Sequence, residues 1–205
     1  MKVIILSLPH MSSSLLLNLL SNCGNTNVDH KERTRIHNYI PNKVNIIKFP
    51  LWNPKLERQI PTDYHRIYLI REPRYMFASL RKRFPRGLPK DHKYLESLTI
   101  WQKYLDLIKS TEIHTLVYPD YICSQNLLKS ICEDLTIEYS EDIWSGHHKR
   151  WIVNEDVPKE KPNPENHIAF RNYQLNQPIT NMNRDFVYNS FIAKIEALES
   201  YQNFF

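Results

Sequence analysis

Two segments far apart in the chain carry side chains that could hold a phosphate group. The first, residues 3–17, is an apolar run rich in β-branched residues, then a turn rich in hydroxyls, then a run of leucines. This order predicts a buried strand, a turn and a helix. Free N–H groups at a helix N-terminus bind anions, and the hydroxyls of Ser12, Ser13 and Ser14 would add donors. We therefore expect an anion site where the strand meets the helix.

A second phosphate-binding pattern lies in residues 67–79. An apolar strand ends at Arg71, Pro73 breaks the backbone, and Ser79 follows on the next predicted helix. A guanidinium forms strong, charge-assisted hydrogen bonds with phosphate, and the hydroxyl of Ser79, on the helix that follows the strand, could reach the same phosphate. Arg71 and Ser79 are therefore expected to bind one phosphate together.

Together these segments resemble the two nucleotide-binding motifs of the sulfotransferase superfamily, whose members take sulfate from 3′-phosphoadenosine 5′-phosphosulfate (PAPS). Pro9 and the run 13–16 match the loop that surrounds the 5′-phosphosulfate in that family. The matches to the later segment, which binds the 3′-phosphate, are Arg71, Pro73, Arg74 and Ser79. The resemblance implies PAPS as co-substrate, 3′-phosphoadenosine 5′-phosphate (PAP) as product, and a nucleotide site formed by Pro9, His10, Met11, Ser12, Ser13, Ser14, Leu15, Arg71 and Ser79.

The first motif departs from the family pattern at three positions. Ser7 and Ser12 stand where glycines are usual, and His10 stands where the family has an arginine or a lysine. An imidazolium at position 10 could donate to the 5′-phosphate and to the bridging oxygen as charge develops there. We therefore expect His10 to take part in catalysis; the alternative is a histidine that only packs in a turn.

Sulfuryl transfer also needs a base for the acceptor's proton, and residues 28–35 occupy the place where the family carries one. This stretch resembles the Glu-Glu-Thr-Arg segment of the tyrosylprotein sulfotransferases, and Glu32 is the matching carboxylate. Asp29 and His30 are the next candidates for the base. The competing interpretation is a solvated, mixed-charge loop. The resemblance implies direct, in-line transfer with no metal.

The elements that must position these residues alternate along the chain. We expect strands over 2–8, 44–49, 66–71 and 113–118, and helices over 14–22, 74–84, 92–110, 122–135 and 184–202. The stretch 113–135 resembles a later strand and helix of the family, so the resemblance covers roughly residues 2–140. The pattern predicts a single α/β domain over 1–205: a central parallel sheet flanked by helices, of the P-loop NTPase-like sulfotransferase fold. Three prolines within 155–166 predict an exposed loop.

Composition narrows the class of protein. The 205 residues are 41% hydrophobic and 24% charged, which is typical of a globular domain. The net charge of +5 favours an anionic partner. Three cysteines without metal-type spacing predict reduced thiols in a reducing compartment. No apolar run is long enough for a membrane anchor, and no signal peptide is evident, so we expect a cytoplasmic protein.

Other functions fit less well. A P-loop phosphotransferase needs a lysine after its turn, and none is present here. No nucleic-acid partner is expected, because the chain lacks a recognised binding module. A non-catalytic PAP-binding protein that kept the fold is the main alternative to an enzyme. The acceptor, a small molecule or glycan that offers a hydroxyl or amine, cannot be chosen, because variable loops form acceptor pockets.

Overall fold

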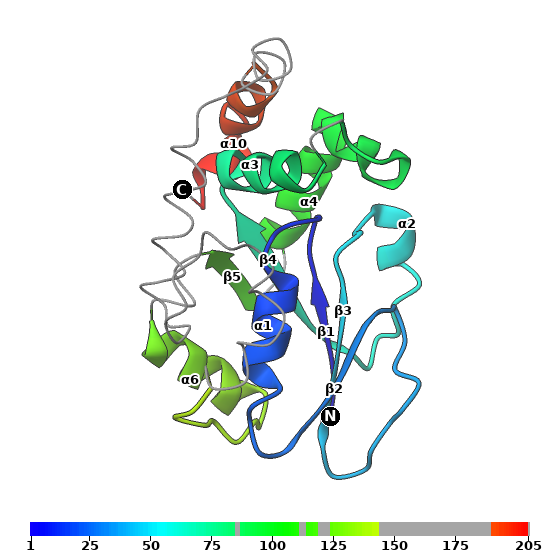
Figure 1. The fold of residues 1–205 in the computed structure, drawn as a ribbon, viewed down its shortest axis with the longest axis vertical. Coiled ribbons are helices and arrows are strands. Elements are labelled where there is room, and N and C mark those ends of the chain that lie inside the picture. The colour runs from blue at the N-terminus through cyan, green and yellow to red at the C-terminus, as the bar shows by residue number, and fades with distance from the viewer. Residues whose placement is uncertain (85–86, 111–113, 119–123, 144–189, 205) are drawn as a thin grey trace.

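The computed structural model describes residues 1–84, 87–110, 114–118, 124–143 and 190–204. In this part of the chain, five parallel strands form one sheet in the order β2-β3-β1-β4-β5. The strands are β1 (Lys2–Leu6), β2 (Thr26–Glu32), β3 (Val44–Phe49), β4 (His65–Arg71) and β5 (His114–Tyr118). They run upward from the N-terminus in Figure 1. The expected α/β fold with a central parallel sheet is confirmed.

The three middle strands of the sheet lie in the core. Val3–Leu6 in β1 and Ile67–Ile70 in β4 are at most 1% exposed, and Ile46 and Ile47 in β3 are equally buried. Strands that are covered on both faces read as continuous apolar runs, which is why these three were recognisable in the sequence. The central strands therefore form a rigid base for the loops at their carboxyl ends.

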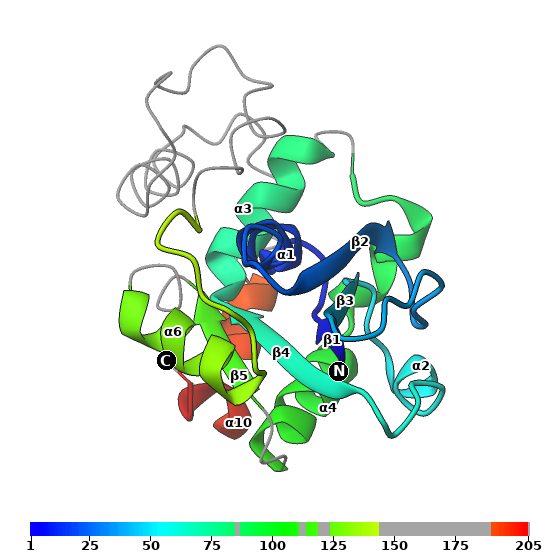
Figure 2. The ribbon, with the colours of Figure 1, turned by 90° about the horizontal axis from the view of Figure 1, so that it is seen from below.

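Helices cover both faces of the sheet (Figure 2). On one face lies α1 (Ser13–Leu20), whose five leucines are all buried. On the other lies α4 (Leu98–Ser110), where the hydroxyl of Tyr104 donates to the carbonyl of Leu69 at 2.8 Å. Burial raises the pKa of the Tyr104 hydroxyl well above its ordinary value. This neutral donor therefore fastens α4 to the backbone of the central strands.

The remaining described helices are α2 (Pro54–Glu57), α3 (Pro73–Arg83), the 3-10 helix η1 (Lys90–Glu96), α6 (Gln125–Asp134) and α10 (Glu199–Gln202). Residues 190–196 are also helical. The predicted helix over 92–110 is in fact two, because Ser97 is extended between η1 and α4. Of the helix predicted over 184–202, residues 184–189 lie outside the described residues, and residues 197–198 interrupt the described part. The loop predicted over 155–166 lies outside the described residues.

One strand, β2, was not predicted. Its sequence, Thr-Asn-Val-Asp-His-Lys-Glu, is polar and is half-buried or exposed throughout. It forms the edge of the sheet, beside β3. The interpretation of residues 28–35 as a solvated loop is therefore wrong for residues 28–32, although the charged side chains are indeed close to solvent.

The strand order sets where a ligand can bind. From β1 the chain runs to the β2–β3 side of the sheet, and from β3 it passes to β4 on the other side of β1. In open α/β sheets, ligands bind beyond the carboxyl ends of the strands at such a reversal. The loop after β1 and the ends of β3 and β4 meet there.

Two of the three cysteines are described, and both are free thiols: Cys23 and Cys132. A side-chain hydrogen bond with Cys132 lowers the pKa of the Cys23 thiol to about 7. The expectation of a reducing compartment stays a prediction. Among the described residues, no helix is long and apolar enough to cross a membrane.

Candidate functional site

The loop between β1 and α1 is held tightly at its start and is strained at its end. Ser7 is fully buried, donates its N–H to Phe49, and accepts a hydrogen bond from the backbone of Trp52 at 3.1 Å. Further along, His10 has φ 62° and Ser12 has φ 72°, so both adopt the left-handed conformation. Side chains other than that of glycine carry a steric cost there. The loop thus keeps a glycine-type backbone at Ser12 without glycine.

Ser12→Gly is expected to raise the free energy of unfolding by about 0.5–1 kcal/mol, because glycine adopts this backbone without steric cost. The freedom of glycine in the unfolded chain keeps the gain small. Ser13 lies in the first turn of α1, so Ser13→Gly is the matched control and should lower the free energy by a similar amount. Urea unfolding followed by circular dichroism measures both. A destabilised Ser12→Gly would show that the side chain of Ser12, not its backbone, determines the loop.

The N-terminus of α1 supports anion binding. Ser12 precedes the helix and makes no side-chain capping hydrogen bond, and the first turn of α1 carries no acidic residue. The first N–H groups of a helix have no acceptor within it, and the helix dipole adds partial positive charge at this end. Ser14 is exposed at this end, whereas Ser13 is buried. The structure therefore offers backbone donors and at least one accessible hydroxyl.

Three other residues predicted for the nucleotide site have buried side chains. Pro9, Met11 and Leu15 face the core, and the N–H of Leu15 already donates to the carbonyl of Ser12 at 2.9 Å. Proline has no N–H to give. Any contact of Pro9 or Leu15 with a ligand would therefore be through backbone atoms or shape, and their assignment to the site stays a prediction.

Residues of the two sequence motifs meet at His10. Its Nδ1 and the hydroxyl of Ser79 share a hydrogen bond of 2.9 Å, and Arg71 donates from Nη1 to its carbonyl oxygen at 2.9 Å. Arg71 is only 8% exposed and stands at the carboxyl end of β4. A guanidinium has donors beyond the one that His10 receives. The structure thus joins the loop after β1 to Arg71 and to α3.

On the opposite side of the loop, Lys48 links it to the candidate base. The ammonium of Lys48, in β3, donates to the hydroxyl of Ser14 at 2.6 Å and lies 3.7 Å from the carboxylate of Glu32. The Lys48 side chain is 10% exposed, whereas that of Glu32 is 50% exposed. A cation therefore stands between the helix N-terminus and a carboxylate that solvent, or a substrate, can reach.

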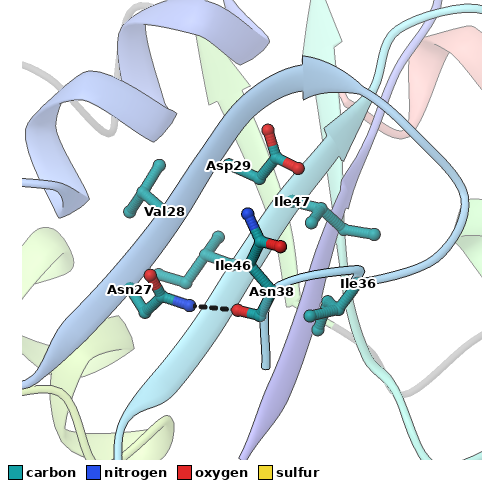
Figure 3. Close-up of a pocket in the computed structure, with 7 residues that line it drawn as sticks. All are labelled: Asn27, Val28, Asp29, Ile36, Asn38, Ile46 and Ile47. Atoms are coloured by element: carbon teal, nitrogen blue, oxygen red, sulfur yellow. Dashed lines mark hydrogen bonds between the residues drawn. The ribbon is translucent and has the colours of Figure 1, made fainter. Parts of the chain in front are cut away.

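The two other candidate bases have different surroundings. Asp29 lines a small pocket formed by β2, β3 and the loop that joins them, together with Asn38 and Ile47 (Figure 3). Its carboxylate accepts from the N–H of Lys31 at 3.0 Å and pairs with Arg33 at 3.3 Å. His30 is exposed. Glu32 lies 3.7 Å from the ammonium of Lys48, which in turn contacts the loop through Ser14.

Two aromatic residues near His10 were not predicted from the sequence. The rings of Phe84 and His92 lie 6.1 Å and 6.4 Å from that of His10, both in edge-on arrangements. Nothing in the local sequence marks Phe84 or His92 as neighbours of His10. Phe84 follows the last residue of α3 and His92 lies in η1, so both are far from His10 in the sequence. Arg74, which matches the family motif, instead pairs with Glu196 at 2.7 Å and is exposed.

Comparison with solved structures identifies the fold. Neither a protein-family model nor a curated protein matches the chain. The sulfotransferase domain from the Synechococcus PCC 7002 olefin synthase aligns with 93% of this chain and 94% of its own, at 12% identity and a TM-score of 0.60. The sulfotransferase domain from the curacin biosynthetic pathway aligns with 97% of each chain, at 13% identity and a TM-score of 0.58.

The chain therefore has the sulfotransferase fold, as the resemblance of its two sequence motifs predicted. At this level of identity the likeness concerns the fold, so activity must be argued from the site.

Proposed function

We propose that this protein is a sulfotransferase that moves a sulfuryl group from PAPS to a hydroxyl or amine acceptor. The observation that carries the proposal is the arrangement around the loop after β1, in a sulfotransferase fold. Arg71 and Ser79 contact His10 on one side, and Lys48 contacts Ser14 and Glu32 on the other. These groups provide the two functions that the reaction needs, which are cations for phosphate and a carboxylate for a proton.

The reaction would proceed by in-line displacement. The acceptor oxygen or nitrogen forms a bond to sulfur while the bond from sulfur to the bridging phosphate oxygen breaks, and PAP departs with that electron pair. Glu32 takes the acceptor's proton. Lys48 and His10 donate to the oxygens on which negative charge grows, and Arg71 with Ser79 holds the 3′-phosphate and so aligns the nucleotide.

The acceptor class is a small molecule or a glycan in this proposal. The accessible carboxylate of Glu32 lies on the edge strand β2, so an acceptor would approach from this edge of the sheet. A hydroxyl on a flexible or branched substrate can enter there without displacing the core strands.

Nucleotide binding and transfer test the proposal separately. At a hundredfold excess over its dissociation constant, PAP should stabilise the fold by about 2.7 kcal/mol. This corresponds to a Tm rise of about 5–10 °C for a domain of this size. Adenosine 5′-phosphate, which lacks the 3′-phosphate, is the comparison ligand and should protect much less. Transfer is then measured with ³⁵S-labelled PAPS and a panel of hydroxyl and amine acceptors.

The outcomes distinguish the candidate functions. Equal protection by the two nucleotides would contradict the 3′-phosphate site and with it the proposal. Protection by PAP without transfer to any acceptor would favour the non-catalytic PAP-binding protein. Transfer of the labelled sulfuryl group to an acceptor, faster than the reaction without the protein, would establish sulfotransferase activity.

The histidine in the phosphate loop makes PAP binding pH-dependent. An imidazole titrates near pH 6.5, and an adjacent phosphate favours its protonated form. Binding then takes up a proton, so affinity is greatest at low pH and falls as the imidazolium is lost. The groups that face His10 include Arg71, which stays charged, and the ring of His92. PAP should bind about tenfold more weakly at pH 8.5 than at pH 6, since a hydrogen bond to a charged group is lost.

Titration calorimetry over that pH range checks this expectation, with His10→Arg as control. Arginine stays charged throughout, so the variant should give a flatter profile, and the ligand's own phosphate titration affects both proteins equally. His92→Phe should keep the slope of the wild type. Parallel profiles for wild type and His10→Arg would assign His10 to turn structure only.

A further inference from the structure

Three aromatic rings from three separate segments surround one another at the phosphate loop. His10 comes from the loop after β1, Phe84 from the end of α3, and His92 from η1. The ring centroids of Phe84 and His92 are 5.4 Å apart, and each lies edge-on to His10 at 6.1–6.4 Å. Edge-to-face arrangements at these separations are favourable.

Both neighbours of His10 are themselves held by the backbone. The N–H of Phe84 donates to Leu80 at 2.8 Å, which closes α3, and the N–H of His92 donates to Pro89 at 2.9 Å, which starts η1. The Nδ1 atom of His92 is buried. The backbones of Phe84 and His92 are therefore anchored, and their rings pack against each other at 5.4 Å.

The neighbouring rings limit how the imidazole of His10 can turn. Its backbone is in the left-handed region, where the loop has few alternatives, but its ring can still rotate about two side-chain bonds. The hydrogen bond to Ser79 at 2.9 Å fixes one ring atom. Edge-on contacts on the ring fix its plane, and a ring already in place loses less entropy when it binds phosphate.

We propose that His92 is a positioning residue for His10: the rings of His92 and Phe84 hold the imidazole of His10 against Ser79, in the orientation that receives the phosphate. This role rests on the proposed function, because it assumes that His10 meets PAP. It requires a flat ring at position 92, and it does not require a titratable one.

The test is PAP affinity measured by calorimetry at a single pH. His92→Ala should weaken PAP binding about tenfold, since two edge-on contacts are removed. His92→Phe should restore affinity to within about threefold of the wild type, because phenylalanine keeps the flat ring. Glu96→Gln, an exposed change in the same 3-10 helix, is the matched control and should bind as the wild type does.

A double-mutant cycle separates positioning from general loss of stability. In a His10→Ala background, His92→Ala should cause little further loss, because the ring it positions is gone. If His92→Ala does not fold, His92→Leu fills the space without a flat ring and replaces it in the cycle. Additive losses of PAP affinity in the cycle, or a His92→Phe variant that binds PAP as weakly as His92→Ala, would overturn the role of His92 and leave the proposed function standing. A wild-type protein that does not bind PAP would overturn the proposed function as well.

Discussion

Arg71→Ala is expected to weaken PAP binding by about 100-fold, the largest effect on affinity of any single change in this site. A charge-assisted hydrogen bond contributes about 1.5–3 kcal/mol, and the side chain is only 8% exposed, so little water competes for it. The same change removes the hydrogen bond to the carbonyl of His10. The loss should therefore combine a missing phosphate contact with a less ordered loop.

Two further variants separate these contributions. Arg71→Lys keeps the charge but not the forked donors, and should recover part of the affinity. Ser79→Ala leaves Arg71 in place, removes the partner of the His10 imidazole, and should cost about fivefold to tenfold, the value of one hydrogen bond.

Arg74→Ala is the matched control, because Arg74 follows closely in sequence, is exposed, and pairs with Glu196. It should leave PAP affinity unchanged. Calorimetry with PAP and with adenosine 5′-phosphate compares these four variants with the wild type. If Arg71→Ala lost affinity for both nucleotides by the same factor, Arg71 would not be recognising the 3′-phosphate.

The amino-acid sequence was sufficient to predict the strands that are buried along their whole length. Val3–Leu6 and Ile67–Ile70 lie at the centre of a parallel sheet, and their side chains contact helices on both faces, so their composition is apolar at every position. The serines of the first motif lie where α1 begins, after β1, and the arginine of the second is the last residue of β4. Their spacing was visible because each motif lies within a single strand–turn–helix unit.

What could not be predicted depends on neighbours that are distant in sequence. β2 lacks any apolar alternation, since it lies at the sheet edge and pairs with β3 only. In the sequence alone, Lys48 could be an exposed lysine or part of the candidate site. The strand order decides, because it places β3 beside β1 and so brings Lys48 within reach of Ser14. His92 becomes relevant only when η1 lies against the loop, which no local pattern indicates.

Glu32→Gln is expected to lower kcat for sulfuryl transfer by about 100-fold, because general-base catalysis typically contributes this much or more. PAP affinity should stay within about threefold of the wild-type value. The carboxylate is half exposed and its distance to Lys48 is 3.7 Å, so the ion pair contributes little to stability or to the position of Lys48. Glutamine keeps the size of the side chain but cannot accept the proton.

The structure also supplies the control for this assignment. Asp29 lies on the same strand as Glu32 and lines the pocket of Figure 3. Its carboxylate accepts from the N–H of Lys31 and pairs with Arg33. Asp29→Asn should therefore keep most of the transfer rate. Steady-state kinetics for both variants, together with calorimetry for PAP, distinguishes catalysis from binding. An active Glu32→Gln with an inactive Asp29→Asn would move the base to Asp29, and would mean that the acceptor enters through that pocket and not along the edge beside Lys48.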